Sequence, residues 1–301
     1  MKISPILNFQ YKPNFTSTTR TTYFSDSEGE FVLPSYNRDL SKRVSSDIRM
    51  VCSNSTNFFR RDLDWQSIGK IFNNQFPKGK ANIYNFACSD GSETYSLIIA
   101  LIEQLGEKKA ERFFPIQASD IDPEIIKMAQ SGKIVATDED IFHIQNMIKN
   151  GKIEKYFNIT RLGYNKNILS AKEILTKNVV FKQASITKGL DEVQKDENNI
   201  ILARNFWKYL SKEGLTEASW KLHEKINEKS LVIIGNFDLG KDGYSPFFID
   251  ALGLVSHSEN DLSENILSKS VLFKAGRLKD KATWMEYIDS NYQFYIPSYI
   301  R

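Results

Sequence analysis

The sequence predicts an α/β fold with a Rossmann-like sheet and helices on both faces, and three observations support this. Residues 82–126 read as a strand, a turn, a helix, a second strand and an acidic turn, which is the order of a βαβ unit. Buried-strand patterns recur at 199–205 and 231–234. Helical patterns separate and follow these strands, and such alternation is typical of α/β proteins.

The composition is that of a globular protein with a full core. The 301 residues are 41% hydrophobic and 12% aromatic, which suits one large domain or two smaller ones. Lys and Arg total 40 against 37 acidic residues, and the resulting net charge of +3 gives no reason to expect a nucleic-acid partner.

Cysteine and histidine usage argues against a disulfide framework or a metal site. Cys52 and Cys88 form no CxxC pair, so we expect free thiols in a reducing compartment. The three histidines have no metal-ligand spacing, so we expect no metal. No apolar run could span a bilayer and the amino terminus lacks the hydrophobic region of a signal peptide, so we expect a cytoplasmic protein without membrane insertion.

The first strand and the first long helix of the βαβ unit enclose a tight turn. Residues 83–86 are a β-prone run, and residues 89–91 form a turn that supplies side chains suited to a helix N-terminus. We therefore expect a helix to begin near Ser92. Apolar residues continue at helical spacing through 97–105, and Gly106 follows where a left-handed residue is favoured.

The second strand is expected to run from Phe113 and Phe114 to Ala118, with Asp120 and Asp122 just past its end. In open α/β sheets the ligand binds beyond the carboxyl ends of the strands, and an acidic residue in this place lies near a ribose. The preceding turn contains neither GxGxxG nor GxxxxGK[ST], so a phosphate cradle is disfavoured. A cofactor that contains a nucleoside is expected instead.

Two motifs of this unit resemble a known family. Residues 87–97, ACSDGSETYSL, resemble the GCSTGEEPYSLA signature of the CheR-type chemotaxis receptor methyltransferases, and residues 118–122, ASDID, resemble their ATDID motif. The alternative is a βαβ unit of another α/β enzyme, which two such motifs at this separation disfavour. The resemblance implies a class I S-adenosylmethionine-dependent methyltransferase sheet, with a small antiparallel β insert at about 150–182.

An earlier segment adds to the resemblance. Residues 54–60, NSTNFFR, resemble the TNxTxFFR segment of the family, and Asn54, Thr56 and Arg60 match it residue by residue. The resemblance implies that these three side chains approach the cofactor. An arginine fork can hold a carboxylate through two hydrogen bonds, although a solvated charge run at 60–62 is the alternative.

Two later strand ends complete the resemblance. Residues 177–186 resemble the strand whose LNL end touches adenine or ribose, with Ser185 in place of Asn. Residues 199–210 resemble IFCRNVxIYF, in which Arg204, Asn205 and Tyr209 match. Trp207 and Lys208 are bulkier or more charged than the usual residues, which predicts a different rim for the pocket.

These matches imply a set of site residues. Tyr209 is expected to position the acceptor carboxylate or assist the methyl transfer, and Arg60 to hold charge near the methyl donor and acceptor. An ionised glutamate is already a nucleophile, so alignment and desolvation matter more than a general base. The expected cofactor-binding residues are Asn54, Thr56, Arg60, Gly91, Glu93, Asp120, Ser185, Ile186, Arg204 and Asn205.

The sequence predicts three regions along the chain. We expect a variable N-terminal arm at 1–50, the methyltransferase domain at 51–258 and a C-terminal extension packed on that domain at 259–301. Further helices are expected at 63–76, 123–130, 138–149, 212–228 and 244–252.

The predicted function is transfer of a methyl group from S-adenosyl-L-methionine to a protein glutamate, with S-adenosyl-L-homocysteine as product and a protein of the chemoreceptor kind as partner. One alternative is a cofactor-binding but inactive regulatory or scaffold protein. The changes that motivate it are Ala87 for Gly, Ser92 for Glu, Thr94 for Pro and Ser185 for Asn. Another alternative is a methyltransferase for a different protein, a small molecule or RNA.

Overall fold

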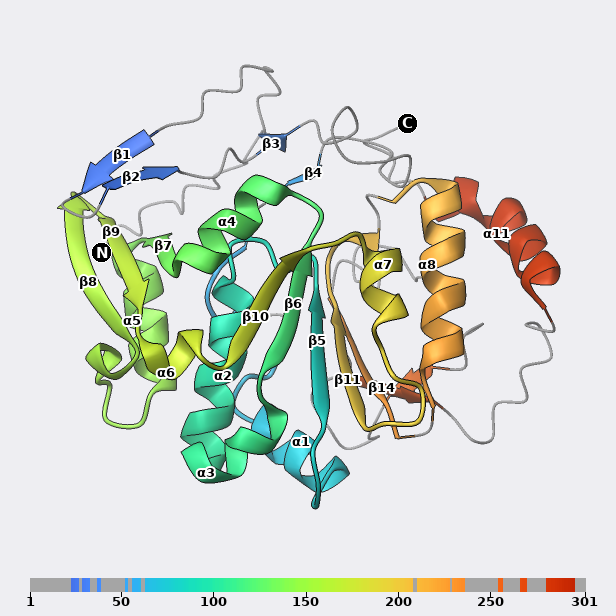
Figure 1. Cartoon of the computed structure of the whole chain (residues 1–301), viewed down its shortest axis with the longest axis horizontal. Helices are drawn as coiled ribbons and strands as arrows, with labels where there is room; N and C mark the ends of the chain where they lie inside the picture. Colours follow the sequence, from blue (N-terminus) through green and yellow to red (C-terminus); the bar gives the residue numbers. More distant parts are fainter. Residues whose placement is uncertain are drawn as a thin grey trace, which may run out of the picture.

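The computed structural model contains one large mixed sheet, one small antiparallel sheet and the helices that cover them (Figure 1). It describes residues 23–26, 29–32, 37–38, 52–53, 56–60, 63–207, 210–227, 229–235, 254–256, 266–269 and 280–295.

The large sheet has seven strands in the order β10-β6-β5-β11-β12-β14-β13. The first five are parallel, and β14 is antiparallel to both of its neighbours. The predicted Rossmann-like α/β class is therefore confirmed. The strands are β5 (Asn82–Phe86), β6 (Ile116–Asp120), β10 (Val179–Gln183), β11 (Asn199–Ala203), β12 (Leu231–Ile234), β13 (Leu254–Ser256) and β14 (Ile266–Lys269).

The path of the chain through this sheet creates a switch point. From β5 the chain moves outward to β6 and β10, and it then returns to place β11 on the other side of β5. Ala203 pairs with Phe86, and Phe86 pairs with Ser119, so the three strands end at the same level. The ligand crevice of open α/β sheets lies beyond the carboxyl ends at such a point.

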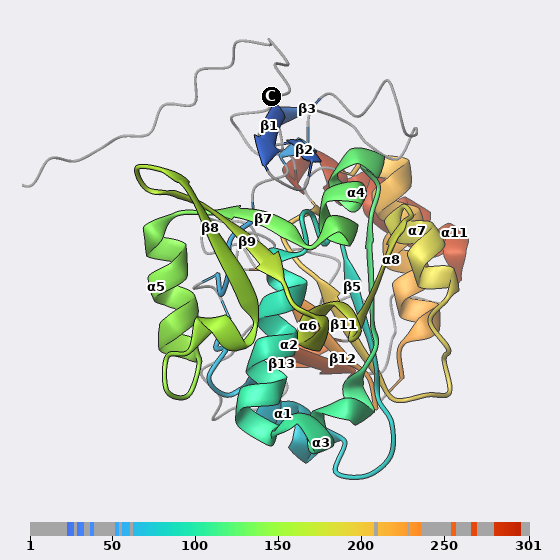
Figure 2. The ribbon, with the colours of Figure 1, turned by 60° about the vertical axis from the view of Figure 1, so that its left-hand side comes forward.

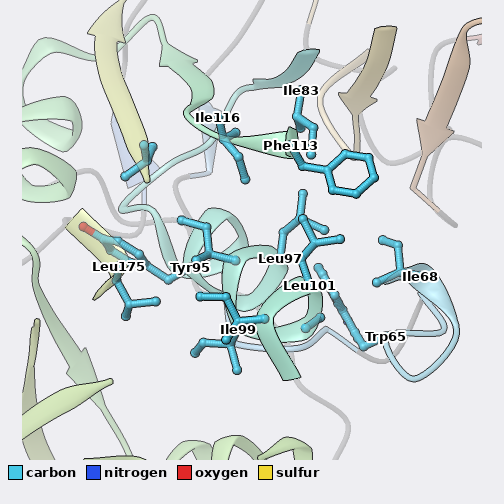
Figure 3. Close-up of a cluster of buried hydrophobic side chains, with 14 of the residues drawn as sticks. Trp65, Ile68, Ile83, Tyr95, Leu97, Ile99, Leu101, Phe113, Ile116 and Leu175 are labelled. Carbon is cyan, nitrogen blue, oxygen red and sulfur yellow. The ribbon is translucent and has the colours of Figure 1, made fainter. Parts of the chain in front are cut away.

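Helices cover both faces of the sheet because successive strand residues point to opposite sides. Ile83 of β5 packs in one apolar cluster with α1 and α2, whereas Tyr84 packs in a second cluster with α7, α8 and α11. Figure 3 shows Leu97 and Leu101 of α2 directed toward Ile83 and Phe113. The helices are α1 (Ile68–Gln75), α2 (Ser92–Leu105), α3 (Glu107–Ala110), α4 (Pro123–Ser131), α5 (Asp138–Met147), α6 (Glu173–Thr176), α7 (Ile186–Asp191), α8 (Lys212–Lys225) and α11 (Lys281–Tyr295).

The small antiparallel sheet has the order β7-β9-β8 and lies beside α5 (Figure 2). It consists of β7 (Lys133–Ala136), β8 (Phe157–Gly163) and β9 (Lys166–Ala171). An antiparallel insert was expected at about 150–182, but β7 precedes that range and β10 belongs to the large sheet. Two further pairs join β1 (Tyr23–Asp26) to β2 (Gly29–Val32) and β3 (Asn37–Arg38) to β4 (Cys52–Ser53).

The expected second strand was too long at its start. Phe113 ends a 3-10 helix, η1 (Glu111–Phe113), and β6 begins only at Ile116. Pro115 precedes the strand, lacks a backbone N–H and so cannot donate to a ladder. A second 3-10 helix, η2 (Ile153–Lys155), leads toward β8.

The expected helix at 63–76 was also too long, because α1 begins at Ile68. Oδ1 of Asp64 accepts a hydrogen bond from Gln66 N at 3.0 Å, and this local bond stabilises a turn in place of a helix. The predictions of α2 near Ser92 and of α4 from Pro123 are confirmed. The expected helix at 244–252 lies outside the described residues.

Candidate functional site

The turn between β5 and α2 is held in an unusual backbone conformation. Ala87, Ser89 and Gly91 have φ values of 53°, 52° and 89°, in the left-handed region. Residues other than glycine rarely adopt this backbone conformation, and those that do cluster at functional sites. A Cβ on Gly91 would lie 2.9 Å from Cζ of Phe181, so only glycine fits there without displacement of its neighbour.

Asp120 fastens this turn to the end of β6. Its Oδ2 accepts a hydrogen bond from Ser89 N at 2.9 Å, and its Oδ1 accepts one from Asp122 N at 3.0 Å. Burial raises the pKa of the Asp120 carboxyl to about 6, against the lowering effect of these two hydrogen bonds, and the charge of Asp122 adds to the rise. Asp120 therefore has a structural role in the turn, whatever ligand it also binds.

Glu93 and Arg204 form a buried ion pair. They lie 111 positions apart in the sequence, and the fold joins Nη1 of Arg204 to Oε2 of Glu93. The guanidinium of Arg204 also lies 5.8 Å from the ring centroid of Trp65, within the range of a cation–π contact. A charge buried in this way is tolerated because it is paired.

The segment that contains Thr56 and Arg60 is attached to α2 and to Trp65, beside the Glu93–Arg204 pair. Phe59 N donates to Ser96 Oγ of α2 at 2.9 Å, and Trp65 Nε1 donates to the carbonyl oxygen of Arg60 at 2.8 Å. Thr56 and Arg60 are partly buried. Trp65 thus links the backbone of Arg60 to the guanidinium of Arg204.

Ser185 and Ile186 begin α7 at the same edge of the sheet. The Ser185 side chain accepts a hydrogen bond from Lys188 N at 3.3 Å and so caps this helix. Ile186 packs against the second apolar cluster. The cap gives a structural reason for a hydroxyl at position 185, because serine is among the best N-cap residues.

Asn205 follows Arg204 with a left-handed φ of 61° and reaches the end of β12. A Cβ on Gly235 would lie 1.9 Å from Oδ1 of Asn205, so the approach of these two strand ends requires a glycine. Sequence reasoning had not identified Gly235, nor Trp65 as a neighbour of the site. Asn54 and Tyr209 lie outside the described residues, so their predicted roles stay predictions.

The edge is acidic, and Cys88 beneath it is inert. Burial and then the charges of Asp120, Asp90 and Glu93 raise the pKa of the Cys88 thiol well above its usual range. A thiol that stays protonated is neither a nucleophile nor a strong metal ligand. Among the described residues there is no group of three or more His, Cys, Asp or Glu placed to hold a metal ion.

The helix N-terminus at this edge is already occupied by a carboxylate. Asp90 Oδ1 accepts hydrogen bonds from Ser92 N at 2.9 Å and from Ser92 Oγ at 2.7 Å. A phosphate at this helix N-terminus would compete with Asp90 for the Ser92 N–H and would meet the negative charges of Asp90 and Asp120. The edge therefore suits a ligand with hydroxyl and cationic groups, and S-adenosylmethionine has both.

The model of the family "CheR methyltransferase, SAM binding domain" matches residues 54–242. The chain belongs to this CheR family. The resemblance drawn from the turn and the second strand is thereby confirmed, and so is S-adenosylmethionine as the ligand of the matched domain.

Named relatives agree with the CheR family. The chemotaxis protein methyltransferase of Listeria monocytogenes serovar 1/2a is 24% identical over 191 residues, which cover 62% of this chain and 66% of that protein. Chemotaxis protein methyltransferase 2 of Vibrio cholerae serotype O1 is 24% identical over 199 residues, which cover 65% of each chain. The chain thus spans slightly less than two thirds of the length of these relatives.

Among solved structures, the methyltransferase domain of bacterial CtHen1-CN is similar at 11% identity and a TM-score of 0.35, over 68% of this chain and 96% of that one. Within the part of this CheR-family chain that the structure describes, no helix is long and apolar enough to cross a membrane.

Proposed function

We propose that the protein transfers the methyl group of S-adenosylmethionine to the side-chain carboxylate of a glutamate in a partner protein. The observation that carries the proposal is the edge formed by the ends of β5, β6 and β11, where the Glu93–Arg204 pair and Asp120 stand around a strained turn. The names of the relatives, chemotaxis protein methyltransferases, support a protein acceptor.

Three side chains are proposed to hold the cofactor. The carboxylate of Asp120 accepts hydrogen bonds from the backbone N–H groups of Ser89, Ile121 and Asp122. Because a carboxylate has about four lone-pair sites, one remains to accept a hydrogen bond from a ribose hydroxyl. Glu93 is held in place by Arg204 and would accept from a hydroxyl or from the ammonium of the methionine part. Arg60 would carry the charge near the two reacting groups, since its backbone is fixed by Trp65.

The proposed reaction needs no general base from the protein. S-adenosylmethionine supplies an electrophilic methyl group on a positively charged sulfur. The acceptor is an ionised carboxylate, so no proton has to be removed, and the negative and positive charges disappear together. The contribution of the protein is alignment and exclusion of water, which we assign to Arg60 and Tyr209.

Transfer of a labelled methyl group tests the proposal. The purified protein is incubated with S-adenosylmethionine that carries a tritiated methyl group and with a synthetic glutamate-rich helical peptide. A peptide with every Glu replaced by Gln is the matched control. We expect label on the Glu peptide alone, released as methanol by mild base because a methyl ester is labile.

Other outcomes favour other functions. Label that resists mild base would indicate nitrogen methylation and a different acceptor. Binding of the cofactor without transfer to any carboxylate would favour a regulatory or scaffold protein.

Tyr209→Phe tests the role proposed for Tyr209. The variant should lower the rate of methyl transfer and leave cofactor affinity unchanged, and an unchanged rate would remove Tyr209 from the mechanism.

A further inference from the structure

One carboxylate oxygen of Asp90, Oδ2, has no hydrogen-bond partner in the described parts of the chain. The side chain is only 9% exposed, and both of its hydrogen bonds, from Ser92 N and Ser92 Oγ, go to Oδ1. No hydrogen bond or ion pair to Oδ2 occurs within the described parts of the chain. The family signature has Thr at this position, so the charge distinguishes this chain from the family pattern.

Most charged groups around Asp90 are acidic. Asp120 and Asp122 lie at the end of β6, Glu93 on α2 and Asp140 on α5. Of the cations at the site, Arg204 is paired with Glu93, and Arg60 is partly buried on the segment that Phe59 attaches to α2. Burial, and to a smaller extent the charges of Asp140 and Asp120, raise the pKa of the Asp90 carboxyl to about 6, against the two hydrogen bonds of Ser92. At neutral pH the edge therefore carries a buried negative charge that a cationic ligand would stabilise.

Two ligands of the proposed reaction differ in the charge that such a group can sense. S-adenosylmethionine has a positive sulfonium, whereas S-adenosylhomocysteine has a neutral thioether, and both keep the same ribose, base, ammonium and carboxylate. Hydroxyl and amide contacts cannot distinguish them. A buried carboxylate at the same edge can, because charge–charge interactions are strong where water is excluded.

We propose that Asp90 is a specificity-determining residue that recognises the positive charge of S-adenosylmethionine and so favours it over the product S-adenosylhomocysteine. The inference rests on the proposed function. It assigns to the turn a preference for substrate over product, which would limit inhibition by the product as it accumulates.

Calorimetric titration with both ligands at pH 8 tests the inference. Asp90→Asn keeps the Oδ1 acceptor for Ser92, so the turn is preserved while the charge is lost. We expect it to weaken binding of S-adenosylmethionine by roughly tenfold and binding of S-adenosylhomocysteine by less than twofold. Asp90→Thr, which restores the family residue, should show the same ratio, and Asp196→Asn at an exposed position should leave both affinities unchanged.

The pH dependence gives a second readout. Between pH 8 and pH 5 the ratio of the two affinities should fall in the intact protein. It should change less in Asp90→Asn, which removes one of the two carboxyls, Asp90 and Asp120, whose pKa is raised to about 6. Equal weakening of both ligands, or an unchanged ratio in both variants, would overturn the inference while leaving the proposed function intact. Failure of the intact protein to bind either ligand would remove both.

Discussion

At the scale of single residues, the site combines strain with buried charge. Left-handed φ values occur at four residues of the site other than glycine: Phe59, Ala87, Ser89 and Asn205. Ala87 and Ser89 follow β5, Asn205 follows β11, and Phe59 is bound to Ser96 of α2. Each such residue costs on the order of 1 kcal/mol or more, so the surrounding contacts must hold it in place. Asp120 and Ser96 supply these contacts through hydrogen bonds to Ser89 N and Phe59 N.

Asp90→Asn should stabilise the protein at pH 8. The pKa of Asp90 is raised to about 6 in the folded state from about 3.8 in the unfolded state, so the charged form disfavours folding and stability falls as the pH rises from 4 to 6. Asn removes this effect, with a gain of up to about 3 kcal/mol in the free energy of unfolding at pH 8. Urea unfolding at pH 4 and pH 8 measures it. A variant less stable than the intact protein at pH 8 would contradict the account.

Arg204→Ala should be strongly destabilising, because it leaves the carboxylate of Glu93 buried without its partner. We expect a loss of about 3 to 5 kcal/mol in the free energy of unfolding. The double variant with Glu93→Gln should recover part of this loss. A double-mutant cycle in urea checks the coupling, and strictly additive losses would indicate that the two residues do not interact.

At the scale of elements, Glu103 joins the end of α2 to the loop that leads into β8. Its carboxylate accepts hydrogen bonds from Lys149 N at 2.8 Å, from Lys155 Nζ at 3.0 Å and from the hydroxyl of Tyr156. Although burial acts to raise the pKa of Glu103, the hydrogen bonds of Tyr156 and Lys155 outweigh it and the pKa is lowered. These bonds connect α2 to the small antiparallel sheet.

Glu103→Gln should therefore destabilise the protein by about 1 to 3 kcal/mol at pH 7, because the uncharged amide cannot accept all three bonds. The lowered pKa means that this stabilisation is present above about pH 5 and is lost in the intact protein as the pH falls below the ordinary glutamate range. The two proteins should differ less at pH 3 than at pH 7 in urea unfolding. An equal difference at both values would exclude the charged carboxylate as the cause.

The sequence predicted those elements in which local pattern and tertiary structure agree. The β5–α2 turn, the start of α2 and the start of α4 were foreseen from glycine, proline and helical periodicity. The strand at Phe113 and the helix at Leu63 were wrong because Pro115 and the Asp64 turn outweigh apolar spacing. Spacing could not reveal the Glu93–Arg204 pair, since their contact depends on β11 lying beside β5. The unused oxygen of Asp90 depends on a side-chain orientation that no pattern encodes.

At the scale of the whole molecule, the core extends beyond the residues that match the CheR family. Trp284 and Ile288 of α11 are fully buried in the second apolar cluster, against α8. Trp284 Nε1 donates to Ser219 Oγ at 3.0 Å, so the indole N–H is satisfied in the interior. Figure 1 shows α11 beside α8, on the side of the molecule away from the small sheet. We infer that this helix belongs to the folding unit of the chain.

Trp284→Ala should lower the free energy of unfolding by about 3 to 5 kcal/mol, because it leaves a large cavity between α11 and α8. Met285→Ala is the matched control on the same helix, since Met285 is 50% exposed and should change stability by about 0.5 kcal/mol or less. Thermal and urea unfolding of the two variants compare them. Equal effects would show that α11 does not complete the core.

The central claim is that the edge formed by β5, β6 and β11 binds S-adenosylmethionine. Calorimetric titration of the intact protein with this cofactor tests it most directly, beside Asp120→Asn and the exposed control Asp196→Asn. We predict saturable one-to-one binding that Asp120→Asn weakens by about tenfold or more and that Asp196→Asn leaves unchanged. Absence of binding to the folded intact protein, or equal affinity in Asp120→Asn, would contradict the account.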